Sequence, residues 1–204
     1  MNKLKKKIFS MLSASLCAIQ AHAILVDRGD YTRDTDTGLD WLDMSFTDGL
    51  SYNAVGALLL PGGSLQGWRF ATSAEFDGLI NSAVGPALAP YTPTGFDPAI
   101  FSQMQTLVSL LGETLNLSPT LSTIGYVDSS SFTFADARQF SHTASQGFVR
   151  PASELDWDRP KSTENDVTGS FLVRKSASSV PDAGSTAVLL SIAISGLFIL
   201  KRRK

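Results

Sequence analysis

The sequence predicts an α+β fold with two or three helices and short, mostly antiparallel strands. Apolar residues recur at helical spacing in the middle of the chain, and short strand-like segments lie on both sides of that region. The length between the two ends suits one domain with its own core. We therefore expect a single domain over residues 24–175, with an N-terminal signal helix before it and a C-terminal hydrophobic helix after it.

Two strong helices are predicted. The first begins at Thr72, where Thr72-Ser73-Ala74-Glu75 has the capping-box pattern. The second begins at Asp97-Pro98 and ends at Gly112. A third helix is predicted over residues 51–60, before Pro61. The stripes expected to be buried are Phe76, Leu79, Ile80 and Val84 in the first helix and Ile100, Met104, Leu107, Val108 and Leu111 in the second.

The strand predictions lie at both ends of the domain. Near its start, residues 24–26 and 38–43 are expected to be strands, with a turn over residues 30–38. The later candidates are residues 121–127, 131–134, 148–149 and 169–174. In the last of these, Phe171 and Val173 should share one face, opposite Leu172 and Arg174. Residues 156–166 are polar and predicted to be a loop.

The N-terminus has the three parts of a secretory signal peptide. A basic region is followed by the apolar segment Ile8–Ile19 and by Ala21-His22-Ala23, in which Ala21 and Ala23 form the cleavage site. Residues 1–23 should therefore be removed, with the Sec translocase and signal peptidase as partners. Cys17, the one cysteine of the chain, leaves with this segment. The mature protein is then expected to use neither a disulfide nor a cysteine nucleophile.

The C-terminus consists of a short linker, a turn motif, an apolar segment and a basic cluster. The linker covers residues 176–179, and the predicted hydrophobic helix covers residues 187–200. Fourteen helical residues span about 21 Å, which is short for a bilayer core of roughly 30 Å. The motif and the basic cluster that frame this segment comprise Val180, Pro181, Asp182 and Gly184, and Lys201, Arg202, Arg203 and Lys204.

This tail resembles the Val-Pro-Asp-Ser-Gly variant of the PEP-CTERM sorting signal of Gram-negative bacteria. Ala183 stands where that motif usually has serine. The resemblance covers residues 180–204 and implies that exosortase, a membrane-embedded cysteine transpeptidase, recognises the tail, cuts near the motif and delivers the ectodomain to the cell surface or matrix. The plainer alternative is a C-terminal membrane anchor. In both cases the basic end should stay on the cytoplasmic side.

The body of the chain also resembles a known group. Residues 36–43, 67–76 and 169–174 resemble landmarks of PEP-CTERM ectodomains, and residues 67–72 are similar to the Gly-Trp-Arg-Leu-Pro-Thr motif of Lcl/DUF1566-like domains. Phe70-Ala71 replaces Leu-Pro here. This resemblance implies a relation to C-type-lectin-like folds. It does not imply a particular activity.

The negative charge of the predicted domain argues against nucleic acid as a partner. Residues 24–179 hold 18 acidic and 9 basic residues, a net charge of −9. A domain with this charge is not expected to bind nucleic acid through its electrostatic field. Envelope polysaccharide is the polymer that such an exported domain is expected to meet.

No constellation of catalytic residues is evident, and we expect the protein not to be an enzyme. His142 is the one histidine after the signal peptide, and it is expected at the surface, outside any triad or zinc site.

Trp157 lies between Asp156 and Asp158, a pattern that suits glycan contact or a pair of catalytic carboxylates. A solvated loop is the favoured interpretation there. Trp157 is kept as a candidate ligand residue, and glycan hydrolase as a distant alternative function. Trp41 and Trp68 are expected in the core.

Calcium is the one cofactor that the sequence suggests. Seven aspartates lie between Asp27 and Asp48, and Asp34 and Asp36 are the candidate ligands because carboxylates at alternate positions suit this ion. The spacing does not match an EF-hand loop. The alternative is that these acids form turns and protect strand edges.

From the sequence as a whole we expect an exported, exosortase-sorted envelope or matrix protein without catalytic activity, or, as the alternative, a calcium- or glycan-binding surface module.

Overall fold

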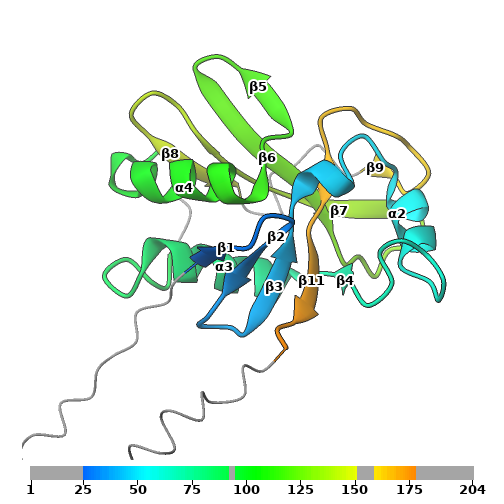
Figure 1. Cartoon of the computed structure of the whole chain (residues 1–204). Helices are drawn as coiled ribbons and strands as arrows, with labels where there is room; N and C mark the ends of the chain where they lie inside the picture. The colour runs from blue at the N-terminus through cyan, green and yellow to red at the C-terminus, as the bar shows by residue number, and fades with distance from the viewer. Residues whose placement is uncertain (1–24, 92–94, 151–158, 178–204) are drawn as a thin grey trace, which may run out of the picture. The chain divides into compact units, whose positions relative to one another are not determined.

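The computed structural model describes residues 25–91, 95–150 and 159–177 (Figure 1). Three α-helices occur there, α2 (Tyr52–Leu58), α3 (Ser73–Val84) and α4 (Phe101–Leu111). Two short 3-10 helices, η1 (Met44–Phe46) and η2 (Pro98–Ile100), precede α2 and α4. Together with two sheets, these helices confirm the predicted α+β class. A first compact unit ends at Arg174.

The first sheet has five strands in the order β1-β2-β3-β11-β4. Its strands β1, β2 and β3 form an antiparallel meander, and β11 pairs antiparallel with β4. The sheet therefore joins the start of the domain to its end. The bounds are β1 (Leu25–Asp27), β2 (Tyr31–Asp34), β3 (Leu39–Leu42), β4 (Arg69–Phe70) and β11 (Leu172–Lys175).

The second sheet has six strands, with β10-β6-β7-β8 as its main path. The long antiparallel pair of β6 and β7 forms its centre. β5 pairs with β6, β9 pairs with β7, and β10 pairs with β6 in the parallel direction. The bounds are β5 (Leu115–Leu117), β6 (Thr120–Val127), β7 (Phe134–His142), β8 (Gly147–Arg150), β9 (Arg159–Pro160) and β10 (Gly169–Ser170).

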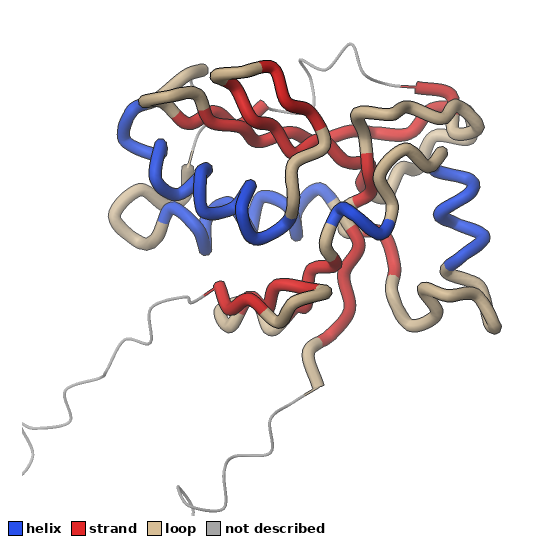
Figure 2. The backbone as a smooth tube through the Cα atoms, turned by 45° about the horizontal axis from the view of Figure 1, so that its top comes forward, coloured by secondary structure: helices blue, strands red, loops and turns tan. Residues whose placement is uncertain are grey.

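Helices α3 and α4 lie between the two sheets (Figure 2). Helix α4 contacts β2 of the first sheet and β6, β7 and β8 of the second. Both helices turn their predicted apolar stripes into one core, which also takes Trp41 from β3 and Phe140 from β7. All nine residues of the two predicted stripes are buried. Phe171 lies in this core, between β10 and β11, where the chain passes from one sheet to the other.

The start of α3 confirms the predicted capping box. Thr72 Oγ1 accepts a hydrogen bond from the Glu75 amide, and Glu75 Oε2 accepts one from the Thr72 amide at 2.8 Å. Arg69 on β4 adds a two-pronged ion pair to the same carboxylate. The hydrogen bond from Arg69, with further help from Thr72, lowers the pKa of Glu75 to about 2 from an ordinary value of 4.5. The cap therefore ties α3 to the edge of the first sheet.

A carboxylate whose pKa is lower in the folded state stabilises the fold above its unfolded pKa and loses this effect as the pH falls. We expect the unfolding midpoint to drop as pH falls from about 4.5 towards 2, and Glu75→Gln to reduce that drop. Thermal unfolding followed by circular dichroism over this pH range measures it. Glu164→Gln, at an exposed position, is the control and should leave the pH profile unchanged. Equal profiles for the Glu75 variant and the unchanged protein would contradict the assignment.

The prediction of one strand over residues 169–174 was wrong, because this segment divides into β10 and β11 of different sheets, and residues 159–160 of the predicted loop form β9. Two further strand predictions were wrong for a common reason. Tyr31–Asp34, predicted as part of a turn, forms β2, and strand β7 runs from Phe134 to His142 instead of ending at Phe134. Both strands bury polar side chains, so they lack the apolar alternation by which strands are recognised. In β2, for example, Thr32 is fully buried and its hydroxyl donates to the Leu110 carbonyl oxygen of α4 at 3.1 Å.

The predicted membrane segments fall outside the described residues. These are the signal segment, residues 1–23, and the hydrophobic helix, residues 187–200. Among the helices that the structure does describe, none combines the length and the apolar character needed to cross a bilayer.

Candidate functional site

Residues 36–43, 67–76 and 169–174 each contribute a strand to the first sheet. Residues 36–43 contain β3, residues 67–76 contain β4, and residues 169–174 contain most of β11. In the sheet these strands are neighbours, in the order β3-β11-β4. Segments more than 100 residues apart in the sequence thus form one continuous piece of structure.

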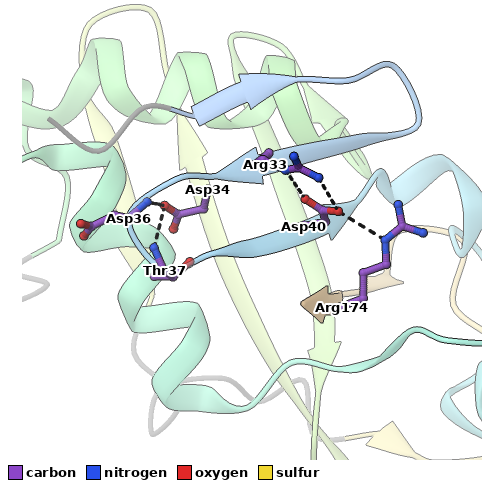
Figure 3. A network of polar contacts seen from close by, with 6 residues as sticks. All are labelled: Arg33, Asp34, Asp36, Thr37, Asp40 and Arg174. Carbon is purple, nitrogen blue, oxygen red and sulfur yellow. Dashed lines mark hydrogen bonds and ion pairs between the residues drawn. The ribbon is translucent and has the colours of Figure 1, made fainter. Parts of the chain in front are cut away.

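A buried carboxylate joins β2, β3 and β11 (Figure 3). Asp40 on β3 accepts hydrogen bonds from Arg33 Nε at 2.7 Å and Arg33 Nη2 at 3.2 Å. Arg174 Nε on β11 donates to the same carboxylate at 3.4 Å. The Asp40 side chain is only 2% exposed, whereas those of Arg33 and Arg174 are 22% and 39% exposed. The ion pair therefore holds β2, β3 and β11 together at the sheet surface.

Aromatic rings complete this cluster. The Arg174 guanidinium lies 4.3 Å from the centre of the Trp68 ring and 4.8 Å from that of Tyr31. Trp41 is 1% exposed and lies in the core, as predicted, but Trp68 is only half-buried under the arginine. Because these charged and aromatic groups contact one another, we assign the cluster to the stability of the sheet.

Asp34 and Asp36, the calcium candidates, differ in their surroundings. Asp34 is fully buried, and its Oδ1 accepts hydrogen bonds from the amides of Asp36 at 2.9 Å and Thr37 at 3.3 Å (Figure 3). The Asp36 side chain is exposed. Asp34 therefore closes the turn between β2 and β3. Within residues 25–91, 95–150 and 159–177, no three histidines, cysteines or acidic residues gather closely enough to hold a metal ion.

Other acids of the same region also bond to the backbone. Asp27 Oδ1 accepts from the Gly29 amide at 2.7 Å in the turn between β1 and β2. Asp43 Oδ1 accepts from the Ser45 amide at 2.9 Å at the start of η1. These contacts agree with the alternative that the acids are turn-forming residues.

His142 is not at the surface, contrary to the sequence-based expectation. It is 7% exposed at the end of β7, where its ring packs edge-on against Phe101 with 5.8 Å between ring centres. Its Nδ1 lies 2.9 Å from the carbonyl oxygen of Thr143. The histidine is buried because β7 continues eight residues beyond the predicted strand end.

Several candidates lie outside the described residues. Among them are Trp157 with its flanking Asp156 and Asp158, and Ala21 and Ala23 of the signal cleavage site. The sorting residues of the tail, in the motif 180–184 and in the basic cluster 201–204, lie outside as well.

A pocket that no sequence motif indicated lies beside α3, on the face of the second sheet that α3 covers. It has a volume of about 360 Å³, and Asp77, Asn81, Tyr91 and Arg138 bring polar groups to its wall. Ile80, Pro90 and Val149 supply the apolar part of the lining. A few polar groups on an apolar wall are typical of small-molecule sites.

Arg138 is the unusual member of this pocket. It is 8% exposed on β7, and its Nε is buried without a hydrogen-bond acceptor among the described residues. Its guanidinium carbon lies 5.9 Å from the centre of the Phe76 ring. A buried polar atom without a hydrogen-bond partner is costly, and a bound ligand that supplies the acceptor would account for it. No sequence motif indicated this residue, because β7 itself was only partly predicted.

Comparison with known proteins gives one match. The VPDSG-CTERM motif matches residues 179–204. A motif of this type implies a sorting enzyme as a partner and suggests export to the cell envelope or surface. No curated protein and no solved structure matches the chain. The comparisons therefore confirm the predicted sorting signal, but they do not confirm the resemblance of the ectodomain to Lcl/DUF1566-like domains or to a C-type-lectin fold.

Proposed function

We propose that this protein is exported, sorted by an exosortase through its C-terminal tail and delivered to the surface or extracellular matrix of a Gram-negative cell as a binding module without catalytic activity. The observation that carries the proposal is the VPDSG-CTERM match over residues 179–204. That match lies at the same end of the chain as an apolar segment and a basic cluster, in the order that a membrane-embedded transpeptidase would require.

The order of groups in the tail supports a transient membrane stage. Residues 187–200 are apolar or small, and the four residues that follow are all basic. Basic residues favour the cytoplasmic side, which leaves the motif at residues 180–184 on the outer side of the membrane, where a transpeptidase can reach it. Cleavage there would release the domain from its membrane segment.

The proposal of a non-catalytic domain is supported by the structural contacts of its acidic and histidine side chains. Buried Asp40 is paired with Arg33, Asp34 closes a turn, and the His142 ring packs against Phe101 beside a backbone carbonyl. In each case the group serves the fold. The pocket at Arg138 offers binding groups of opposite charge, which suit recognition of a ligand.

The sorting proposal is tested with the full chain in an exosortase-bearing host and in the same host without that enzyme. We expect the protein to lose its C-terminal peptide and appear at the surface only when the enzyme is present. A chain with Pro181→Ala and Asp182→Ala should keep the tail and stay with the membrane fraction. Mass spectrometry of the C-terminal peptide and fractionation with immunoblotting measure these outcomes.

Ala183→Ser is the matched control for this experiment. It changes the same motif towards the usual serine, so processing should be at least as complete as in the unchanged chain. Intact tails on surface protein in the exosortase-bearing host, or identical processing of the Pro181/Asp182 variant, would overturn the sorting proposal.

A further inference from the structure

The wall of the pocket beside α3 combines one buried positive charge with hydrogen-bonding groups of that helix. Arg138 follows the strand alternation of β7, so its side chain shares a face with Phe140, which packs in the core against Phe76 of α3. This alternation directs the guanidinium towards α3 and into the pocket wall. The charge is thus held in place by the same packing that holds the core.

Helix α3 supplies two further polar side chains to the lining of the same pocket. Asp77 and Asn81 are four residues apart, so they lie on one side of the helix, and both line the pocket. Asn81 Oδ1 accepts a hydrogen bond from the Tyr91 amide at 2.8 Å, which fixes the segment after α3 at the pocket and leaves the Asn81 side-chain amino group to donate. Asp77 is exposed and can accept hydrogen bonds.

The buried Nε of Arg138 indicates the charge of the ligand. Its Nε is buried with no acceptor among the described residues, although a guanidinium ordinarily satisfies its donors in a fixed, fork-like pattern. A carboxylate matches that pattern with two parallel hydrogen bonds. Asp77 in the same lining disfavours a doubly charged phosphate and favours a ligand that also carries a hydrogen-bond donor.

We propose that this pocket binds a small organic carboxylate that carries a hydrogen-bond donor near its acid group, with the carboxylate on Arg138 and the donor on Asp77. A volume of about 360 Å³ admits a single sugar-acid or amino-acid unit. The apolar wall formed by Ile80, Pro90 and Val149 would contact the carbon skeleton of that unit. This inference deepens the proposed function, because it names a ligand class for the surface domain.

The experiment measures binding by the full chain, purified in mild detergent, with isothermal titration calorimetry. Glucuronate and glutamate are the carboxylate probes, and glucose and inorganic phosphate are the probes without a carboxylate. We expect at least one carboxylate probe to bind, and neither glucose nor phosphate to bind comparably. Arg138→Met keeps the length and apolar packing of the side chain but removes the charge, and should weaken binding at least about tenfold.

Arg150→Met is the matched control. Arg150 lies on the neighbouring strand β8, its Nε is also buried without an acceptor among the described residues, and it does not line the pocket. The control should leave affinity unchanged and shows whether any loss in the Arg138 variant comes from charge removal in general. Unfolding midpoints equal to that of the unchanged protein establish that both variants keep the fold.

Asp77→Asn distinguishes the two sources of the carboxylate. An asparagine oxygen still accepts a hydrogen bond from a sugar hydroxyl, so a sugar acid should keep its affinity within a few-fold. An ammonium group loses its charge partner, so an amino acid should bind at least about tenfold more weakly.

Two outcomes would overturn the inference. One is that no carboxylate probe binds the unchanged protein. The other is that Arg138→Met binds the probe as well as the Arg150→Met control does. Neither outcome depends on whether the tail is processed, because binding is measured on purified protein, so failure of this inference and failure of the sorting proposal can be told apart.

Discussion

Replacement of Phe171 by alanine is expected to lower the free energy of unfolding by about 3–5 kcal/mol. The ring is 1% exposed, and its centre lies 5.0 Å from that of Phe76, 6.0 Å from that of Phe140 and 6.4 Å from that of Trp41. These rings come from α3, β7 and β3. A cavity at this position therefore removes ring contacts that α3, the first sheet and the second sheet make with one side chain.

The backbone around Phe171 limits the relaxation that would reduce this cost. Its amide donates to the Tyr126 carbonyl oxygen at 2.9 Å, and its own carbonyl oxygen accepts from the Ala71 amide at 2.8 Å. The residue is thus held from the second sheet on one side and from the segment before α3 on the other. The neighbours cannot readily close the space left by the missing ring.

Chemical denaturation of the full chain in detergent measures this effect, with Phe132→Ala as the control. Phe132 is fully exposed, at 101% relative accessibility, in the connection between β6 and β7. Its replacement should change the free energy of unfolding by no more than about 0.5 kcal/mol. Similar losses for the two variants would show that Phe171 is not the centre of the core.

The helices were predictable because their signals are local. The capping box at Thr72, the N-cap acid Asp97 and the closing Gly112 each act within a few residues, and all three occur where the sequence placed them. The structure refines the start of the second helix, where Pro98–Ile100 forms a 3-10 turn before α4 begins at Phe101, and shortens the helix predicted over residues 51–60 to Tyr52–Leu58.

The strands that were missed owe their structure to distant partners. Tyr31–Asp34 is rich in polar residues, and it becomes a strand because β1 and β3 pair with it on its two sides. Likewise, β7 carries Asp136, Arg138 and His142 but is held by pairing with β6 along its length and with β8 at its far end. A short segment of sequence does not show which distant strands will pair with it.

The candidate pocket could not be predicted for the same reason. Its polar wall combines Asp77 and Asn81 of α3 with Arg138 of β7, more than 50 residues further on. In the sequence, Arg138 is an ordinary charged residue, and only the packing of β7 against α3 shows that it is buried. Residues 36–43, 67–76 and 169–174, in contrast, carry recognisable local motifs, and each contributes one strand to the first sheet, in the order β3-β11-β4.

The ion pair in that sheet leads to the second large effect. Replacement of Asp40 by alanine is expected to lower the free energy of unfolding by roughly 3 kcal/mol, at the lower end of the range for breaking a buried pair. Two arginines would lose a common partner, which is costly. Because the Arg33 and Arg174 side chains are 22% and 39% exposed, water can partly replace the lost carboxylate.

Asp36→Ala is the control for this prediction, because it removes an acid of the same region whose side chain is exposed. Its effect should stay within about 0.5 kcal/mol. Arg174 also stacks on Trp68, so the Asp40 variant should alter the tryptophan fluorescence of the folded protein as the guanidinium shifts, whereas the Asp36 variant should not. If the two variants unfold at the same denaturant concentration, the Asp40 pair contributes nothing to stability, and the strand order β3-β11 must then depend on backbone pairing and on the apolar side chains beneath it.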